Sequence, residues 1–227
     1  MVSPPVVLVP GFATSASRTW GDNGWIDLLA DIGRTAIALD VLGSGSCEKP
    51  HDPAAYATFE QHLLDRFPSD PVDAIGFSLG ARTLLTLAAL HPDRFNSLIV
   101  AGVGRNLFER DATGESIASA IDGTGDSDDP TVRYFIQLAG APDQDPLALA
   151  AFMRRPSAVA ITPELLGAIT CPVLVVLGDK DFAGPADPLM AALPHSRLVT
   201  LRNVDHFATP KDFGFIDAAL GFLSGSD

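Results

Sequence analysis

The sequence predicts an α/β fold built on a mostly or wholly parallel six-stranded sheet with helices on both faces. Short apolar, β-branched runs alternate along the chain with longer helical patterns, as in parallel strands joined by crossover helices. Several runs are continuously apolar, which is typical of strands covered on both faces. Every connection is long enough for a right-handed crossover, and 227 residues, 47% of them hydrophobic, suffice for a full core.

The predicted elements follow from these runs in chain order. The strands are Val6–Val9, Thr35–Leu39, Val72–Gly76, Leu98–Val103, Val173–Leu177 and Arg197–Leu201. The helices between and after them are Trp25–Ile32, Tyr56–Phe67, Leu79–Leu90, Pro188–Leu193 and Phe213–Leu223. The alternation breaks once, between the fourth and the fifth strand.

An insertion causes this break. About 65 residues, from Arg105 to Thr170, separate the two strands, far more than an ordinary connection. The segment contains an acidic, glycine-rich stretch from Asp122 to Asp129, followed by two helical patterns around Arg133–Leu138 and Leu147–Arg154. We therefore expect an α/β core with an inserted helical lid: the core comprises residues 1–104 and 171–227, and the lid comprises residues 105–170.

The apolar residues of the insertion have two interpretations. Side chains at helical spacing more often pack than line a pocket, but a lid must present some of its apolar face to the cleft beneath it. The residues concerned are Leu107, Phe108, Phe135, Ile136, Leu138, Leu147, Phe152 and Met153. We expect an apolar acyl or alcohol pocket under the lid. Arg154 and Arg155 either hold a substrate carboxylate or are exposed cations at a helix end.

Composition and charge exclude several classes of function. The formal net charge is −13, and no lysine and arginine cluster is present to displace counterions from nucleic acid. No apolar run approaches the roughly 20 residues that span a bilayer, and Met1 to Pro5 lacks the basic start of a secretory signal. Cys47 and Cys171 are too few for a disulfide framework. We expect a cytoplasmic protein that acts on a small-molecule substrate. We expect it to need no metal or organic cofactor and to bind neither membranes nor nucleic acid.

Ser78 is the candidate nucleophile. It lies in Gly76-Phe77-Ser78-Leu79-Gly80, between an apolar strand and a helix rich in leucine and alanine. A tight strand-to-helix turn projects a serine hydroxyl into a site, and the two flanking glycines suit a turn that crowds its neighbours. An ordinary turn in which Ser78 caps the helix is the alternative. The order of strand, motif and helix favours the nucleophile.

Three segments together resemble the α/β-hydrolase family, and the resemblance covers essentially the whole chain. Besides the Ser78 motif, Val6–Phe12 is similar to the family's strand and His-Gly-x turn, and Asp40–Pro50 to its Asp-x-x-Gly-x-Gly-x-Ser loop. The resemblance implies an α/β-hydrolase fold that starts at the family's third strand, without the two leading ones. Pro10 and Ser44 stand where the family often has histidines that brace these loops.

The resemblance also implies a base and an acid. His206 follows the last predicted strand, where the family's base takes the serine proton and returns it to the leaving group. Asp181 lies after the fifth strand, in Gly178-Asp179-Lys180-Asp181, and corresponds to the acid that orients the histidine. Asp179 is the nearest competitor. The remaining histidines lie at turns, at helix ends or on exposed positions: His51, His62, His91 and His195.

An oxyanion hole is implied as well. The family supplies backbone N–H groups from two positions, which correspond here to Phe12 and Leu79. Leu79 also begins a helix, whose dipole favours negative charge. The Phe12 side chain has a simpler interpretation as an apolar wall, and both roles are compatible because the donor is backbone.

These residues predict a serine esterase of the carboxylesterase type. Such an enzyme cleaves a small or medium ester through an acyl-enzyme intermediate. Lactonase, thioesterase and carbon–carbon bond hydrolase activities use the same residues, and a fold does not separate them. A non-catalytic receptor that binds a small ligand under the lid is the rival from another class.

Overall fold

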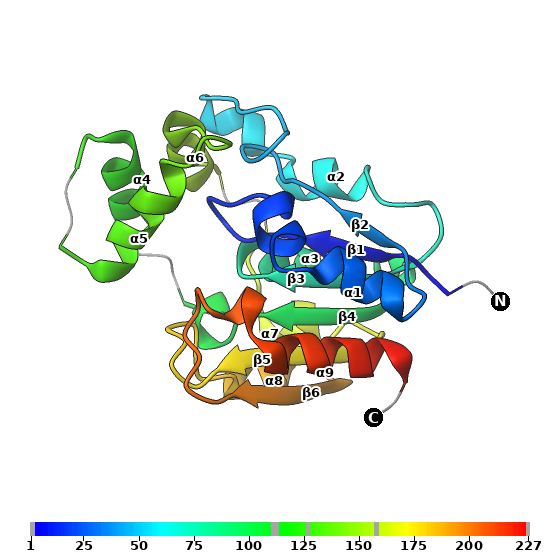
Figure 1. The fold of residues 1–227 in the computed structure, drawn as a ribbon. Helices are drawn as coiled ribbons and strands as arrows, with labels where there is room; N and C mark the ends of the chain where they lie inside the picture. The colour runs from blue at the N-terminus through cyan, green and yellow to red at the C-terminus, as the bar shows by residue number, and fades with distance from the viewer. Residues whose placement is uncertain (1–2, 110–113, 126–127, 157–158, 226–227) are drawn as a thin grey trace.

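A parallel sheet organises the chain. A computed structural model describes residues 3–109, 114–125, 128–156 and 159–225. Its sheet has six strands, all parallel, in the order β2-β1-β3-β4-β5-β6 (Figure 1), which confirms the predicted fold class. The strands are β1 (Val6–Val9), β2 (Ala36–Ala38), β3 (Val72–Phe77), β4 (Phe95–Ala101), β5 (Val173–Gly178) and β6 (Ser196–Leu201).

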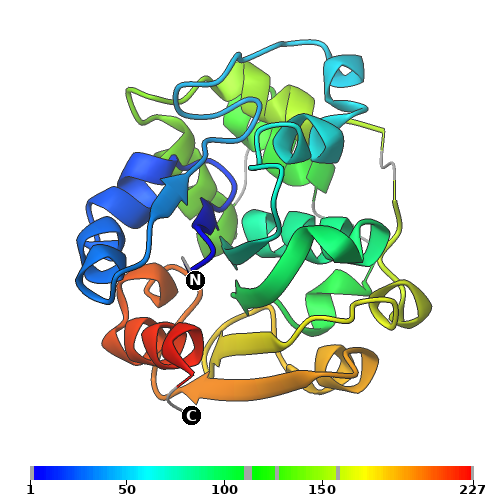
Figure 2. The ribbon, with the colours of Figure 1, turned by 90° about the vertical axis from the view of Figure 1, so that its right-hand side faces the viewer.

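Helices cover both faces of this sheet. Val6 and Leu8 of β1 belong to the apolar cluster under one helical layer, whereas Val7 and Val9 belong to the cluster under the other. This two-sided burial explains why the strands are continuously apolar. One layer contains α1 (Trp25–Asp31) and α9 (Phe213–Ser224); the other contains α2 (Phe59–Leu64), α3 (Leu79–Leu90) and α8 (Asp187–Ala192) (Figure 2).

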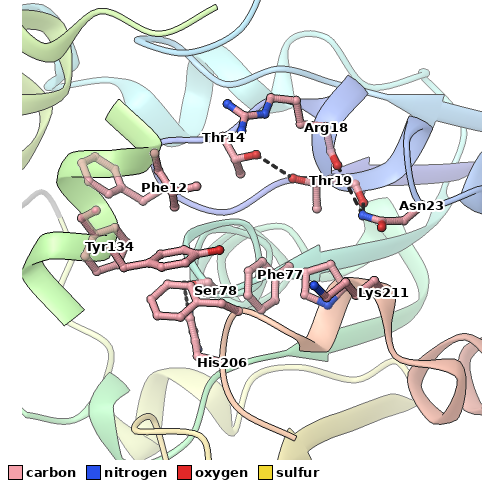
Figure 3. Close-up of a pocket in the computed structure, with 14 residues that line it drawn as sticks. Phe12, Thr14, Arg18, Thr19, Asn23, Phe77, Ser78, Tyr134, His206 and Lys211 are labelled. Atoms are coloured by element: carbon pink, nitrogen blue, oxygen red, sulfur yellow. Dashed lines mark hydrogen bonds between the residues drawn. The ribbon is translucent and has the colours of Figure 1, made fainter. Parts of the chain in front are cut away.

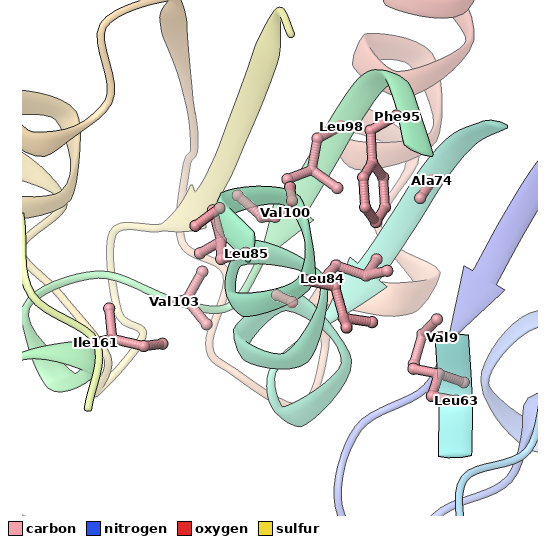
Figure 4. Close-up of a cluster of buried hydrophobic side chains, with 14 of the residues drawn as sticks. Val9, Leu63, Ala74, Leu84, Leu85, Phe95, Leu98, Val100, Val103 and Ile161 are labelled. Carbon is pink, nitrogen blue, oxygen red and sulfur yellow. The ribbon is translucent and has the colours of Figure 1, made fainter. Parts of the chain in front are cut away.

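The helix α3 lies at the centre of its layer. Its Leu84 and Leu85 are fully buried in one cluster with Val9, Ala74 and Val100 from three neighbouring strands (Figure 4). Burying a leucine side chain contributes about 1.5–3 kcal/mol. This packing fixes the start of α3 at the carboxyl edge of the sheet, and Ser78 immediately precedes that start.

Two elements differ from the prediction for reasons of backbone geometry. β4 spans Phe95–Ala101 rather than Leu98–Val103, because its first residues pair with the start of β3 and Gly102, at φ +69°, turns the chain out of the strand. The second predicted helix is shorter than expected, because the Pro53–Tyr56 segment forms a separate 3₁₀ turn ahead of α2.

The described residues of the insertion form four α-helices. They are α4 (Gly114–Asp122), α5 (Pro130–Ala139), α6 (Pro146–Met153) and α7 (Pro163–Leu166). The helical patterns expected from the sequence correspond to α5 and α6, which begin after the capping residues Asp129 and Asp145, each followed by proline. The helix α4 was not predicted.

These helices occupy two places. α4 packs on α5 and α6, beyond the carboxyl ends of the strands (Figure 1), whereas α7 packs on α3 and α8 of the core. Residues 110–113, 126–127 and 157–158 of the expected lid, and 1–2 and 226–227 of the expected core, lie outside the described residues. Within the described part of the chain, no helix has the length and apolarity needed to cross a bilayer.

Candidate active site

Ser78 lies on a sharp turn between β3 and α3. Its backbone adopts φ 52° and ψ −110°, a conformation that is strained for a residue with a side chain. A Cβ added at Gly76 would lie 2.6 Å from the Ala81 nitrogen, and one added at Gly80 would collide with the Val9 carbonyl oxygen. The turn therefore requires both glycines. The Ser78 side chain makes no capping hydrogen bond to α3, so the structure does not match the capping alternative.

His206 connects Ser78 to Asp181. Its Nε2 lies 3.0 Å from Ser78 Oγ, and its Nδ1 lies 2.9 and 3.0 Å from the two Asp181 carboxylate oxygens. The carboxylate can only accept, so Nδ1–H donates to it, and Nε2 is left to accept from the Ser78 hydroxyl. Both side chains are buried, with 3% of the His206 side chain and 0% of the Asp181 side chain exposed. The three residues form a continuous hydrogen-bonded line.

Asp181 and Asp179 have different partners, although they are two residues apart. Asp181 Oδ1 also accepts from the Ala183 backbone N–H at 2.8 Å, which fixes the carboxylate beside His206. Asp179 is exposed, and its Oδ1 accepts from the Asn203 N–H at 2.7 Å. The structure thus brings Asp181 to His206 and uses Asp179 to hold the turn after β6.

Aromatic rings surround the His206 imidazole. The ring centroids of Phe182, Phe77 and Phe207 lie 4.3, 4.9 and 5.3 Å from that of His206. Gly102 lies against the same ring, and a Cβ there would lie 3.1 Å from His206 Cε1 and 2.7 Å from Phe77 Cε2. This apolar enclosure lowers the local dielectric and strengthens the hydrogen bonds of the line.

The two expected oxyanion donors lie beside the Ser78 turn. Leu79 is the first residue of α3, and Phe12 follows β1 in the loop that contains Gly11. Within the described part of the chain, neither backbone N–H donates to a protein acceptor. The Phe12 ring stacks on Phe152 of α6 at 5.7 Å and meets Phe135 of α5 edge-on at 5.7 Å. The Phe12 side chain is thus also an apolar wall residue.

Asp40 braces the loop that carries Phe12. Its Oδ1 accepts from the Ala16 N–H at 2.7 Å, and its Oδ2 accepts from the Ser46 N–H at 2.7 Å. Gly45 has φ +57°, and a side chain there would collide with the Asp40 carboxylate. The sequence identifies the motif Asp40–Pro50 but does not predict this bracing contact.

A cavity of about 160 Å³ opens above Ser78 and His206 (Figure 3). Its apolar part is formed by Phe12, Phe77, Phe207 and the α5 residues Tyr134, Phe135 and Leu138. Tyr134 stacks on Phe207 at 3.7 Å between ring centroids, so α5 contacts the segment that carries His206. A cavity of about this size accommodates a benzene-sized group in other proteins.

The apolar residues and the two arginines of the insertion that the sequence offers as pocket residues lie in different places. Only Phe135 and Leu138 of that set line the cavity; Leu107, Phe108, Phe152 and Met153 pack in or against the core cluster, and Ile136 and Leu147 are exposed. Arg154 bonds to Glu115 and Asp122 of α4, and the Arg155 guanidinium lies 3.6 Å from the centroid of the Phe152 ring. Both arginines make contacts within the protein, and neither lines the cavity.

The polar lining of the cavity was missed from the sequence. It consists of Thr14, Arg18, Thr19 and Asn23 from the β1–α1 connection and Lys211 from the segment after His206. Both segments leave the carboxyl edge of the sheet, where ligands bind in α/β folds. That topological rule is the signal that identifies them.

Known proteins resemble the chain along most of its length. A sequence model of the alpha/beta hydrolase fold matches residues 4–116. The pimeloyl-[acyl-carrier protein] methyl ester esterase of Neisseria meningitidis is 31% identical, over 82% of this chain and 83% of that protein. The 2-hydroxy-6-oxo-6-(2'-aminophenyl)hexa-2,4-dienoic acid hydrolase of Metapseudomonas resinovorans is 25% identical, over 97% of this chain and 84% of that protein.

Solved structures show the same architecture. MenH from S. aureus superposes with a TM-score of 0.75 at 20% identity, covering 99% of this chain and 95% of that one. At this identity the likeness speaks for the fold alone. Together with the sequence relatives and the all-parallel sheet, it shows that the chain belongs to the α/β-hydrolase fold family.

Proposed function

We propose that the protein is a serine hydrolase that cleaves a small or medium carboxylic ester, with Ser78 as nucleophile, His206 as base and Asp181 as supporting acid. The observation that carries this proposal is the hydrogen-bonded line, with 3.0 Å between Ser78 Oγ and His206 Nε2 and 2.9 Å between His206 Nδ1 and Asp181. A nucleophile, a base within reach of it and a group that orients the base are the parts that acyl transfer needs.

The first half-reaction transfers the acyl group to Ser78. The Oγ attacks the ester carbonyl carbon while His206 Nε2 takes its proton, and the Asp181 carboxylate stabilises the imidazolium that forms. The backbone N–H groups of Phe12 and Leu79 stabilise the negative charge on the carbonyl oxygen. His206 then returns the proton to the leaving alkoxide, which departs as the alcohol.

The second half-reaction uses water. His206 Nε2 takes a proton from the water, whose oxygen attacks the acyl-enzyme carbonyl carbon. The new tetrahedral intermediate expels Ser78 Oγ, which regains its proton from His206. The free acid leaves, and the enzyme returns to its starting protonation state. No metal or organic cofactor is needed for either half-reaction.

The two unpaired thiols, Cys47 and Cys171, favour a reducing, cytoplasmic setting.

Residues 105–170 act in this proposal as a lid over the cavity. The support is that α5 supplies Tyr134, Phe135 and Leu138 to the cavity lining. Tyr134→Ala removes the stack on Phe207 and should raise KM for a medium-chain ester several-fold, whereas Tyr134→Phe keeps the ring and should change KM less than twofold. Equal KM values for both variants and the wild type would contradict a lid role for α5.

The primary test is hydrolysis of p-nitrophenyl esters from acetate to octanoate, beside Ser78→Ala. We expect turnover across the shorter members and its loss in Ser78→Ala, while the variant stays folded because the change removes one oxygen. Absence of turnover over the whole series would contradict the ester proposal. Slow or absent labelling of the wild type by a fluorophosphonate would favour the rival, a non-catalytic receptor.

The second candidate function is carbon–carbon bond hydrolysis, acting on an acid such as the one in the name of the Metapseudomonas relative. It is favoured by the 25% identity over almost the whole chain and by the aromatic lining, which suits a ring-bearing ligand. Parallel assays with that acid, a lactone, a thioester and an ester of matched size separate these activities. The ester proposal predicts the highest kcat/KM for the ester.

A further inference from the structure

The cavity above Ser78 has two cations and no acid in its wall. Arg18 and Lys211 are among the 14 lining residues, and none of those 14 is Asp or Glu. This composition contrasts with a chain whose formal net charge is −13. A cationic wall in an acidic protein concentrates positive potential at the cavity and favours an anionic ligand there.

The cations lie apart from Phe12 and Tyr134 of the apolar wall. Figure 3 shows Phe12 and Tyr134 at the left of Ser78, and Arg18 and Lys211 above it and to its right. A ligand with its ester carbonyl at Ser78 therefore has an apolar wall on one side and a charged wall on another.

The protein holds both charged segments in place. Arg18 lies in a single turn of π-helix, Ser17–Gly21, which Asn23 stabilises by donating from Nδ2 to the Thr19 carbonyl oxygen at 2.9 Å. Lys211 ends the 3₁₀ turn that starts at Thr209, and the Trp25 indole donates to the Pro210 carbonyl oxygen in that turn at 2.8 Å. These contacts position the two cations without using their charges.

The positive charges of Lys211 and Arg18 make few contacts with acids in the described part of the chain. Over the described part of the chain, Lys211 forms no ion pair, and Arg18 has one long contact, 3.5 Å from its Nη1 to Asp143 Oδ1. Both partners of that contact are more than 30% exposed, so the contact contributes little. Two acids are adjacent in sequence to lining residues and accept backbone hydrogen bonds: Asp205, beside His206, from the Ala208 N–H, and Asp212, beside Lys211, from the Gly214 N–H.

We infer that Lys211, supported by Arg18, forms a carboxylate-binding subsite, and that the substrate is an ester with a carboxylate remote from the scissile bond. This inference rests on the proposed ester hydrolysis and names the substrate class. The ammonium and guanidinium groups donate charge-assisted hydrogen bonds to the carboxylate, and these are stronger than neutral ones. The ester carbonyl meanwhile lies at Ser78.

The test compares pairs of esters that differ only in the charge. Monoethyl adipate against ethyl hexanoate places the carboxylate on the acyl side, and 6-butyryloxyhexanoate against hexyl butyrate places it on the alcohol side. We expect one pair to show a kcat/KM at least about tenfold higher for the charged member, and the preference to shrink with added salt. Equal or lower values for the charged member in both pairs would overturn the inference.

Variants connect the preference to the named residues. Lys211→Gln should reduce the ratio of charged-ester to neutral-ester kcat/KM about fivefold or more, Lys211→Arg should retain this ratio, and Arg18→Gln should reduce it less. Arg202→Gln is the matched control, because Arg202 is exposed and does not line the cavity. An unchanged preference in Lys211→Gln, or an equal loss in Arg202→Gln, would overturn the subsite. Absence of Ser78-dependent turnover with every ester would instead overturn the proposed function.

Discussion

Two buried pairs of ionisable side chains lie at opposite edges of one sheet. At the amino edge, Arg34 pairs with Asp73 of β3, and at the carboxyl edge His206 pairs with Asp181. The side chains of the first pair are 7% and 8% exposed, and those of the second 3% and 0%. Both pairs are therefore buried.

The pairs differ in what surrounds them. Arg34 also donates to the carbonyl oxygens of Pro4 and Leu223, and Asp73 accepts from the Ser97 hydroxyl at 2.6 Å, so this network closes within the protein. At the carboxyl edge, His206 Nε2 faces Ser78 and the cavity. A buried pair is by itself weak evidence of a functional site, because structural ion-pair networks are buried too. What distinguishes the second pair is that His206 Nε2 contacts the Ser78 hydroxyl beneath a cavity.

The largest expected effect is the loss of turnover when Ser78 is replaced. Ser78→Ala should lower kcat for the best ester about 10⁶-fold, because it removes the nucleophile. The free energy of unfolding should change by less than about 1 kcal/mol, as measured by urea denaturation, because one oxygen is lost at a partly exposed site. A loss of stability that accounts for the lost activity would contradict the distinction between the two edges.

Asp181→Asn should have the next largest effect. An amide at this position no longer favours the Nδ1–H tautomer of His206, and kcat should fall about 10⁴-fold. Asp179→Asn is the control, since that carboxylate is exposed and bonds to Asn203, and its kcat should stay within twofold of the wild type. Steady-state kinetics measure kcat for the two variants. A comparable loss of kcat in both would contradict the assignment of Asp181 as the supporting acid.

Arg34→Met tests the closed network at the amino edge. Removing one partner leaves the buried Asp73 carboxylate without its ion pair and should lower the free energy of unfolding by about 3–5 kcal/mol. The kcat of the folded fraction should stay unchanged, because this network is at the far edge of the sheet from Ser78. A reduced kcat at full folding would show that the two edges are coupled.

Ser97→Ala should have the smallest effect. It removes the hydroxyl that donates to Asp73 but leaves the ion pair with Arg34, so the loss should be about 1.5–3 kcal/mol, measured in urea. Kinetic constants should again be those of the wild type. A loss as large as that of Arg34→Met would mean that the hydroxyl, rather than the guanidinium, is the main partner of Asp73.

The same contrast explains what could be predicted from the sequence. The strands β1, β3 and β5 are predictable because continuous apolar runs are local. Ser78, Asp181 and His206 are candidates because each follows a strand in a position that resembles the family, and the structure brings the three side chains together. The partnership of Arg34 with Asp73 was not found, since 39 positions separate them and neither lies in a motif. Asp73, an acid inside an apolar strand, was the only local signal.

The insertion and the cavity wall were predicted less well. The short helix α4 was missed, and which face of α5 points to Ser78 depends on its packing with α4 and α6, which local periodicity does not specify. Arg154 and Arg155 were considered as carboxylate ligands because they lie in the insertion, but their contacts are with Glu115, Asp122 and Phe152. The cations that line the cavity come instead from core segments at the carboxyl edge.

Labelling with a fluorophosphonate, followed by mass spectrometry of the modified peptide, tests the activation of Ser78 most directly. We predict one adduct per chain, located on Ser78, that forms rapidly in the wild type and at least about a thousandfold more slowly in Asp181→Asn. An unmodified Ser78 in folded protein, or labelling at the same rate in both proteins, would contradict a serine activated by His206 and Asp181.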